Sequence, residues 1–395
     1  MEPLLPHAGR SDLAELSARI FRKSGQLDAS LPSPVVRQEV AKLVTGMNSY
    51  YSNLIEGHKT LPRDIERAMR DDFSPLPDDQ RNQLLSVAHI KAERSMRNRL
   101  AAEKDLNPFD PDFISWLHHE FYSHIPESDW FTTSHEGIRH SLNPGAMRDH
   151  NVDVGRHTPP DHASLPLFMR RFHSCYSSSE LPATDALIAV AAAHHRLAWI
   201  HPFGDGNGRV GRLQTQAAMI RIGLDGEGLW TLSRGLARTR STYYTRLQNA
   251  DQGRHNDYDG RGNLSDRGLS EFCIYFLEQI LDQLDFMIGL IEPFHLRQRI
   301  ENYFRFNRVD LEPRFRDPLI KLVTELILKG EIPRGAVPGI LGLKGTASRE
   351  VIRKALDEGL AYSTTEKGPL RIAFPSKVAE YYFPLLFSDL PVGGS

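Results

Sequence analysis

Cysteine is almost absent from the sequence. The 395 residues include two cysteines, Cys175 and Cys273, and neither belongs to a Cys-x-x-Cys or Cys/His pattern. This scarcity excludes a disulfide scaffold and disfavours a structural zinc site. An excess of charge of either sign is also lacking, because 48 Lys and Arg face 50 Asp and Glu. We therefore do not expect the whole chain to bind nucleic acid or anionic membranes non-specifically.

Long apolar runs are lacking as well. The most apolar stretch, 186–193, is far too short for a membrane-spanning helix, and the first residues lack the basic and apolar segments of a signal peptide. We therefore expect a cytoplasmic protein that does not associate with membranes. What is present is an ordinary globular composition, 40% hydrophobic and 25% charged, in a chain long enough for two or three domains.

The spacing of apolar residues predicts a mainly α-helical fold. From Val36 to Tyr51 such residues recur every three or four positions, and Gly57 follows as a helix stop. A helix with Thr184 as its N-cap is apolar almost throughout, which predicts a place in the core. Helices are expected over 35–56, 77–102, 165–176, 184–199, 210–222, 236–248 and 269–292.

Glycine and proline interrupt this pattern between residues 134 and 160. Pairs such as Asn143-Pro144 and Pro159-Pro160 separate short segments. Such punctuation is typical of a loop or a β-hairpin. The sequence therefore predicts a small non-helical element in the middle of the chain.

The order of predicted elements changes after about residue 310. Helices at 318–329, 336–341 and 348–359 precede two short strands at 362–365 and 370–374, which is the order of a winged helix-turn-helix. Residues 311–377 hold twelve basic and eight acidic residues, a mild excess of positive charge. One interpretation is a DNA-binding unit, with Ser348, Arg349, Arg353 and Lys354 facing the groove and phosphates.

The segment between the predicted helices 184–199 and 210–222 has the composition of an anion-binding loop. Residues 201–212 read His-Pro-Phe-Gly-Asp-Gly-Asn-Gly-Arg-Val-Gly-Arg. Gly204, Gly206 and Gly208 allow the backbone to approach a ligand closely, and the start of the following helix favours phosphate. Arg209 and Arg212 are three residues apart, so both guanidinium groups can reach the same phosphates.

Other side chains of this segment suit phosphate chemistry. Asp205 can supply an oxygen ligand to Mg²⁺ held between phosphates. His201, with an ordinary pKa of about 6.5, is the natural general base at the entrance of the loop. Phe203 is interpreted as an anchor that buries its ring and holds the loop in place. A plain glycine turn with solvated arginines would not require so many matched residue types.

Residues 201–212 resemble the motif HPFx[D/E]GNGRxxR of the Fic domain at every fixed position. The resemblance extends over roughly 110–295 and implies a helical core with a β-hairpin flap that docks the target. Residues 144–148, Val152, Val154 and Gly155 resemble the flap, and Tyr243 and Tyr244 resemble the residues beside the adenine. The chain then divides into an N-terminal helical region (1–110), a Fic catalytic core (111–295), a winged-helix domain (300–378) and a tail (379–395).

The resemblance implies AMPylation, the transfer of AMP from ATP to a Ser, Thr or Tyr hydroxyl of a protein, by a nucleotidyltransferase that also modifies itself. His201 would take the hydroxyl proton, and Asp205 would hold Mg²⁺ as cofactor. The amides of 206–208 with Asn207 would bind the α- and β-phosphates, while Arg209 would bind the polyphosphate and Arg212 the γ-phosphate. The target protein is unknown, and oligomerisation is expected without a defined state.

A second motif resembles the family's inhibitory pattern [S/T]xxxE[G/N]. Ser52 and Glu56 are four residues apart on the predicted helix 35–56, and Gly57 follows. The resemblance implies a class whose inhibitory helix precedes the core and whose Glu pairs with the second Arg of the motif. A bidentate contact between Glu56 and Arg212 would occupy the guanidinium that the γ-phosphate needs. We therefore hypothesise an autoinhibited enzyme.

Several alternatives stay open at this point. The chain could be a DNA-binding regulator whose Fic core senses nucleotide, although the mild local charge favours an interaction or dimer module. It could remove AMP from a modified protein, because the inhibitory Glu could also orient water. Relatives that transfer another group from a diphosphate donor are a further alternative. Tyr243 and Tyr244 could be core aromatics, and His194 and His195 are interpreted as packing residues.

Overall fold

The computed structural model describes residues 1–31, 33–133, 137, 139–177 and 181–387, and the fold is mainly α-helical, as predicted. The helices are Arg10–Ser30 (α1), Pro34–Ile55 (α2), Pro62–Ala68 (α3), Pro77–Ala102 (α4), Pro111–Tyr122 (α5), Leu165–Tyr176 (α6), Ala183–Ile200 (α7), Asn207–Arg221 (α8), Leu232–Arg238 (α9), Arg240–Asp251 (α10), Asp266–Ile291 (α11), Pro293–Asn302 (α12), Pro313–Lys329 (α13), Val337–Leu341 (α14), Gly345–Asp357 (α15) and Ser376–Tyr382 (α16). The strands are Phe131–Thr133 (β1), Arg139–Ser141 (β2), Glu331–Ile332 (β3), Ala361–Tyr362 (β4) and Leu370–Ile372 (β5).

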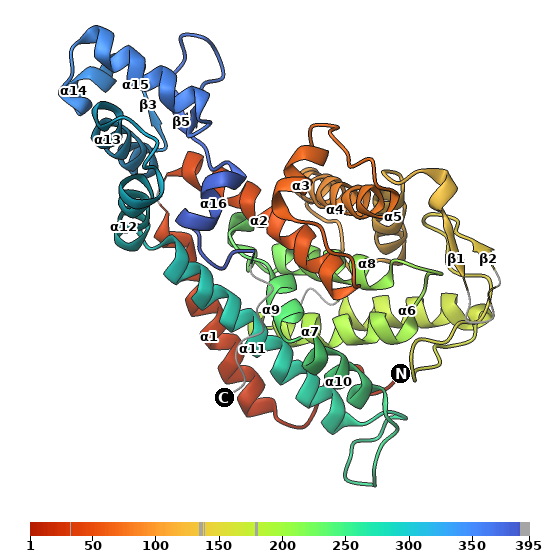
Figure 1. Ribbon diagram of the computed structural model, residues 1–395. Coiled ribbons are helices and arrows are strands. Elements are labelled where there is room, and N and C mark those ends of the chain that lie inside the picture. The colour runs from red at the N-terminus through yellow and green to blue at the C-terminus, as the bar shows by residue number, and fades with distance from the viewer. Residues whose placement is uncertain (32, 134–136, 138, 178–180, 388–395) are drawn as a thin grey trace.

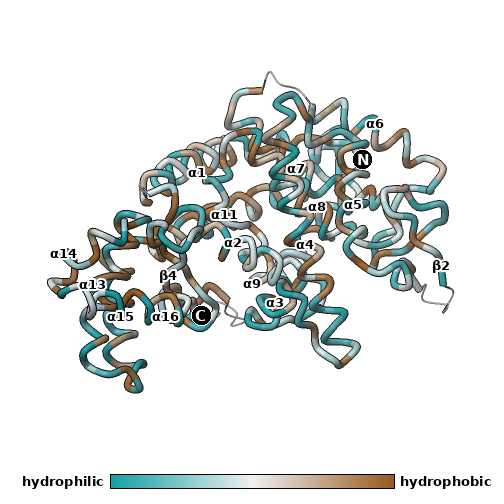
Figure 2. Tube along the Cα trace, turned by 90° about the horizontal axis from the view of Figure 1, so that it is seen from above, coloured by the Kyte–Doolittle hydropathy of each residue, from teal (hydrophilic) through white to brown (hydrophobic). Residues whose placement is uncertain are grey.

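Helix α7 lies in the centre of the core, and its almost uninterrupted run of Ala, Ile, Val and Leu is buried. Helices α6, α8 and α11 pack around α7, and α1 lies along α11 (Figure 1). Figures 1 and 2 both place the β1–β2 hairpin and the helices α13–α15 at opposite ends of the molecule. No helix of the described ranges has the length and apolar character needed to cross a bilayer.

Two predicted helix boundaries are wrong. Helix α7 begins at Ala183 after Pro182, so Thr184 lies inside the helix and no side chain caps its start. Proline fixes its own φ before the helix but has no side-chain oxygen, so Pro182 cannot cap the first N–H groups of α7. The predicted helix 236–248 is two helices, α9 and α10, because Thr239 leaves the helical region at φ −114° and ψ 33°.

The central non-helical element is a hairpin that lies partly ahead of the residues expected to form it. Strands β1 and β2 pair antiparallel, with Phe131 opposite Ser141. The segment with Val152, Val154 and Gly155 forms no strand and has only an isolated bridge between Val154 and His157. Here the chain reverses too tightly for a second ladder, since the bridge joins residues three apart and Gly155 adopts a positive φ of 61°.

The C-terminal unit, residues 313–383, has the predicted order of three helices and two strands, with the additional short strand β3 ahead of α14 and the additional helix α16 after β5. The three strands form an antiparallel sheet in the order β3-β5-β4. Its assignment as a winged helix stays a prediction. Ser348 cannot face a groove, because it is 1% exposed and its hydroxyl donates to the Leu343 carbonyl. Lys354 is paired with Glu358 at 3.1 Å.

The C-terminal unit contacts the N-terminal half of α2. The Tyr362 hydroxyl donates to Glu39 Oε1 at 2.9 Å, and the Lys42 ammonium lies 5.6 Å from the centre of the Tyr362 ring. Ser33, at the start of α2, donates to the Lys329 carbonyl at 3.3 Å. A cavity of about 1400 Å³ lies beside this contact, lined by residues of α2, α3, α4 and α16. The unit therefore supports the helix on which Ser52 and Glu56 lie.

A buried arginine ties the first residues of the chain to the core. The Arg196 side chain on α7 is fully buried, and its Nε and Nη2 donate to the Pro3 carbonyl at 3.0 and 2.7 Å. Its Nη1 donates to the Ala250 carbonyl at 3.3 Å. Arg196→Ala is expected to lower the free energy of unfolding by about 2–5 kcal/mol, because it leaves a cavity and unpaired carbonyls.

Urea denaturation followed by circular dichroism measures this loss. Arg10→Ala is the matched control, since Arg10 makes an exposed ion pair with Asp185 that contributes about 0–1 kcal/mol. Equal free energies for the two variants would contradict the structural role of Arg196.

Candidate active site

The predicted anion-binding loop joins α7 to α8 in the structure. His201 ends α7 in the left-handed region at φ 49°, an uncommon conformation for a residue with a side chain. Gly206 precedes α8 at φ 78°, and a Cβ there would lie 2.9 Å from the Tyr122 ring. Both the conformation and the lack of space therefore require glycine at position 206.

Phe203 and Asn207 hold this loop in shape. Phe203 is 2% exposed, which agrees with its predicted role as an anchor. Asn207 Oδ1 accepts from the Phe203 N–H at 2.9 Å, and Asn207 Nδ2 donates to the Phe203 carbonyl at 2.8 Å. The Asn207 side chain, which was predicted to bind phosphate, therefore closes the loop in this structure. Its position as the first residue of α8 leaves its backbone N–H at the helix start, where anions bind.

Asp205 lies at the entrance of the loop, with half of its side chain exposed. Its Oδ2 accepts from the Tyr122 hydroxyl at 2.7 Å and lies 3.4 Å from Arg209 Nη2. Burial alone would raise the pKa of Asp205, but Arg209 and Tyr122 outweigh it and lower the pKa. The carboxylate is therefore ionised at neutral pH.

These residues fit Mg²⁺ only together with a polyphosphate. Among the residues that the structure describes, no group of three or more His, Cys, Asp or Glu side chains could hold a metal ion. Mg²⁺ commonly binds one or two carboxylates and takes its other oxygens from substrate phosphates and water. A single ionised carboxylate at the entrance of an anion-binding loop meets that requirement.

Arg209 is a buried cation with unused hydrogen-bond donors. Its side chain is 5% exposed, and its guanidinium lies 5.0 Å from the centre of the Phe121 ring. Within the described part of the chain, its Nε and Nη1 have no hydrogen-bond partner. Buried polar groups are almost always paired, so these two donors point to an anionic ligand that pairs with them when bound.

Arg212 is bound by Ser52 of α2 and by Glu56, which follows the last residue of α2. Its Nε donates to the Ser52 hydroxyl at 2.9 Å, and its Nη2 donates to the Ser52 carbonyl at 2.8 Å. The same Nη2 donates to Glu56 Oε1 at 2.7 Å. The structure therefore pairs Glu56 with Arg212, as the motifs predict. The contact is a single hydrogen bond from Nη2 and not a bidentate one, and Ser52 takes Nε and the second hydrogen of Nη2.

The Glu56 carboxylate lies against the start of α8. A Cβ added to Gly208 would overlap Glu56 Oε1. Burial would raise the pKa of Glu56, but Arg212 and Arg209 outweigh it and lower the pKa. Helix α10 holds the end of α2, since Arg240 Nε and the Tyr244 hydroxyl donate to the Ile55 carbonyl at 2.8 and 3.2 Å. A negative charge of the protein itself thus occupies the anion-binding helix start.

The two tyrosines predicted beside the adenine differ in environment. Tyr243 is 4% exposed, and its hydroxyl is 2.8 Å from His194 Nε2. His194 also bonds Thr215, which agrees with its interpretation as a packing residue. Tyr244 is 41% exposed and contacts the end of α2. An adenine contact stays a prediction for both residues, and the exposed Tyr244 is the better placed.

The predicted flap residues lie near the surface and are linked to the loop by Arg148. Val154 is 39% exposed, and Val152 is partly exposed. Arg148 Nε donates to the His201 carbonyl at 3.0 Å, and the Arg148 N–H donates to the Pro202 carbonyl at 2.9 Å. Arg148 thus connects the flap segment to the start of the motif, a role that no local sequence signal indicated.

The environment of His201 keeps its imidazole neutral. Burial, together with Arg148 and His157, lowers its pKa to about 4. A general base must be unprotonated, so we expect the rate of any reaction that uses His201 to fall only as the pH drops through about 4. Initial rates between pH 4 and 8 measure this, with circular dichroism at each pH as the control for unfolding. An acid limb near the ordinary pKa of 6.5 would contradict the prediction.

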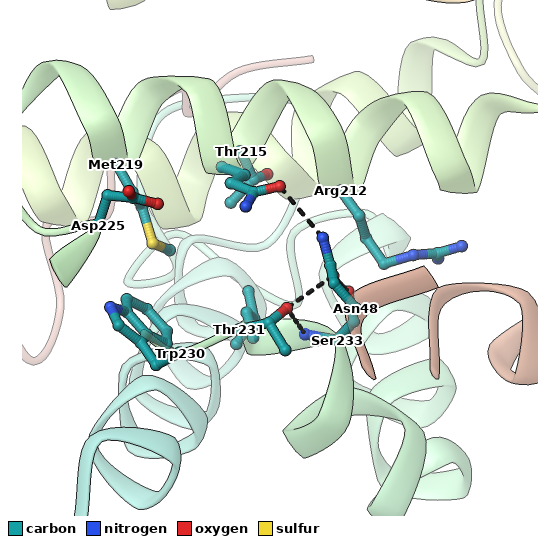
Figure 3. A pocket seen from close by; sticks show the side chains of 10 residues that line it. Asn48, Arg212, Thr215, Met219, Asp225, Trp230, Thr231 and Ser233 are labelled. Atoms are coloured by element: carbon teal, nitrogen blue, oxygen red, sulfur yellow. Dashed lines mark hydrogen bonds between the residues drawn. The ribbon is translucent and has the colours of Figure 1, made fainter. Parts of the chain in front are cut away.

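A small enclosed pocket of about 20 Å³ lies behind Arg212, between α8 and the start of α9. Figure 3 shows Asn48, Thr231 and Ser233 on one side of it, and Asn48 Oδ1 accepts from both hydroxyls at 2.6 Å. Asn48 Nδ2 donates to Glu93 Oε2 at 2.7 Å. The pocket has space for about one water molecule. The hydrogen bonds of Asn48 beside it hold α2 against α9 and α4.

Comparison with known proteins gives consistent results. Residues 108–219 match the Fic/DOC family. Over 79 residues the chain is 39% identical to "Protein adenylyltransferase Fic" of Drosophila erecta and of Drosophila melanogaster. In both cases the aligned segment covers 20% of this chain and 16% of the relative. The match thus spans about a sixth of the length of these curated relatives.

Two solved structures share the fold. A Fic family protein from Desulfovibrio desulfuricans G20 has a TM-score of 0.55 at 15% identity, over 94% of this chain and 99% of that chain. Fic-1 from C. elegans has a TM-score of 0.55 at 17% identity, over 71% of this chain and 73% of that chain. The part of the chain that matches the Fic/DOC family, residues 108–219, contains this helix–loop–helix anion site.

Proposed function

We propose that the protein is a protein adenylyltransferase that transfers AMP from ATP to a Ser, Thr or Tyr hydroxyl of a target protein and of itself. The observation that carries this proposal is the convergence of three groups on the start of α8: the buried Arg209 with two unpaired donors, the ionised Asp205 and the neutral His201. The relatives named protein adenylyltransferase support the same reaction class.

The residues divide the reaction between them. His201 accepts the proton of the target hydroxyl, whose oxygen attacks the α-phosphorus of ATP; the bond to the bridging oxygen breaks and pyrophosphate leaves. Arg209, Arg212 and the N–H groups of 206–208 bind the phosphates. Asp205 would hold Mg²⁺, which neutralises phosphate charge when bound. The exposed Val152, Val154 and Gly155 would dock the target through backbone hydrogen bonds.

We further propose that the enzyme is autoinhibited by Glu56. Its carboxylate pairs with Arg212 and occupies the helix start, so the γ-phosphate has neither its cation nor its space. ATP can then bind only in a pose unsuited to in-line attack. We place the protein in the cytoplasm, with oligomerisation through surfaces outside this site. The C-terminal unit is proposed as an interaction module and not as a DNA reader, because Ser348 is buried and Lys354 is paired.

Labelled ATP tests the proposed reaction directly. The purified Glu56→Gly variant is incubated with Mg²⁺, a cell lysate and ATP labelled at either the α- or the γ-phosphorus. We expect protein labelling from the α-label alone and an intact-mass increase of one AMP. Labelling from the γ-label would indicate phosphorylation instead, and release of AMP from labelled protein by the parent chain would favour the reverse reaction. Labelling by neither form would refute the proposal.

A further inference from the structure

His118, on α5, bridges two segments of the candidate active site. Its side chain is fully buried, and its Nδ1 accepts from the Gly145 N–H at 2.8 Å. A ring nitrogen that accepts carries no proton, so the proton of the neutral imidazole is on Nε2. That Nε2–H donates to the Asp205 carbonyl at 3.2 Å. One imidazole therefore connects Gly145 of the flap segment to Asp205 of the motif loop.

The surroundings of His118 fix its ring in this position. The ring stacks on Phe203, with centroids 4.0 Å apart and planes 16° apart. The Tyr122 ring also contacts it, at 4.8 Å between centroids, and the Tyr122 hydroxyl donates to the Asp205 carboxylate. Helix α5 thus holds Asp205 twice, by its carbonyl through His118 and by its carboxylate through Tyr122.

Gly145 reaches His118 only because it is glycine. Its φ is 88°, and a Cβ there would lie 3.2 Å from both the Ser115 carbonyl oxygen and His119 Cβ on α5. The absence of a side chain lets the backbone N–H of residue 145 approach the helix. Three residues further along, Arg148 binds the His201 and Pro202 carbonyls. The flap segment therefore has two separate attachments to the motif loop, one at Gly145 through His118 and one at Arg148.

We propose that His118 is a positioning residue for AMP transfer: it fixes the Asp205 backbone for Mg·ATP binding and the Gly145 backbone for target docking, and so sets the distance between the two. The inference rests on the proposed function. A packing role alone would be met by any flat ring of similar size, whereas the positioning role requires the acceptor and the donor on opposite edges of the ring.

Three variants separate these roles, each made in the Glu56→Gly chain. His118→Phe keeps the ring that stacks on Phe203 and removes both hydrogen bonds. His118→Asn can place its side-chain oxygen near the position of Nδ1 and keep the bond from Gly145. His118→Gln can place its amide nitrogen near the position of Nε2 and keep the bond to Asp205. Thermal melting of each variant shows whether it is folded.

Two readouts do not depend on activity. For the hydrogen bond to Asp205, calorimetry measures ATP affinity with Mg²⁺ and with EDTA. We expect His118→Phe and His118→Asn to weaken Mg·ATP binding by about 10-fold, a typical effect of removing a residue that orients a ligand. The affinity of His118→Phe and His118→Asn for ATP in EDTA should change less. The affinity of His118→Gln for Mg·ATP should also change less. For the Gly145 side, amide hydrogen exchange of residue 145 should be faster in His118→Phe and His118→Gln than in His118→Asn.

Kinetics then test the link to catalysis. We expect His118→Phe to need more Mg²⁺ for half-maximal auto-AMPylation and to show a lower maximal rate, with partial rescue in His118→Gln. A folded His118→Phe variant with unchanged Mg·ATP affinity and unchanged exchange at Gly145 would overturn the inference. If the Glu56→Gly parent transfers no AMP, the proposed function fails, while calorimetry and hydrogen exchange still decide the role of His118.

Discussion

His201→Ala is expected to lower AMP transfer by about 10²–10⁴-fold, the usual contribution of a general base. The hydroxyl of a protein side chain holds its proton tightly at neutral pH, so attack on phosphorus needs an acceptor for that proton. Burial, Arg148 and His157 lower the pKa of His201 to about 4, so the imidazole is neutral and can accept this proton at neutral pH. Initial rates of label transfer from α-labelled ATP, in the Glu56→Gly chain, measure the effect.

The control separates catalysis from binding. Substituting His162 by alanine removes a partly exposed imidazole whose partners, Asn151 and Asp161, lie outside the motif loop, and its rate should match the parent. ATP affinity of His201→Ala should also be unchanged, because the phosphate contacts lie on α8. Equal transfer by the two variants would remove His201 as the base.

Glu56→Gly is expected to raise auto-AMPylation by about 10- to 160-fold. The hydrogen bond from Arg212 to Glu56 joins two charged groups, and such a bond contributes about 1.5–3 kcal/mol, which converts to that range of fold-change. Its loss frees Arg212 for the γ-phosphate and clears the space beside Gly208. Quantitative autoradiography of the parent and the variant at equal protein and ATP concentrations measures the gain.

Glu103 provides a matched control for this substitution. It follows the last residue of α4 as Glu56 follows the last residue of α2, and it pairs with an arginine of its own helix. Glu103→Gly therefore reproduces the loss of a helix-end carboxylate at a distance from the motif loop. Activation by both variants would show that Glu56→Gly acts by destabilising the fold and not by releasing Arg212. Adding Arg212→Ala to Glu56→Gly should abolish the gain.

Features that depend on neighbouring residues were predictable from the sequence. The pattern of apolar positions predicted α4 at its observed bounds and α2 to within a residue. The loop between α7 and α8 was predictable because glycine, phosphate-binding arginines and a helix start lie within twelve residues. The boundary between α9 and α10 was missed, because a single residue, Thr239, interrupts an otherwise continuous helical pattern.

Features that depend on distant residues were not predictable in this way. The contact between Glu56 and Arg212 joins residues 156 positions apart, and it was predicted only through a resemblance between motifs. The partners of Asp205 were missed, because Tyr122 and His118 are 83 and 87 positions away on a helix with no motif of its own. The hairpin was displaced from its predicted strands since short strands are determined by pairing geometry as much as by composition.

Helix α2 connects the C-terminal unit to the start of α8. Its 22 residues rise about 1.5 Å each and form one rod, held at Ser33, Glu39 and Lys42 by the C-terminal unit. The far end of this rod carries the carboxylate that pairs with Arg212. A tilt imposed at the N-terminal end of α2 therefore displaces its C-terminal end. A partner that moves the C-terminal unit could thus alter the ion pair between Glu56 and Arg212 from several helical turns away.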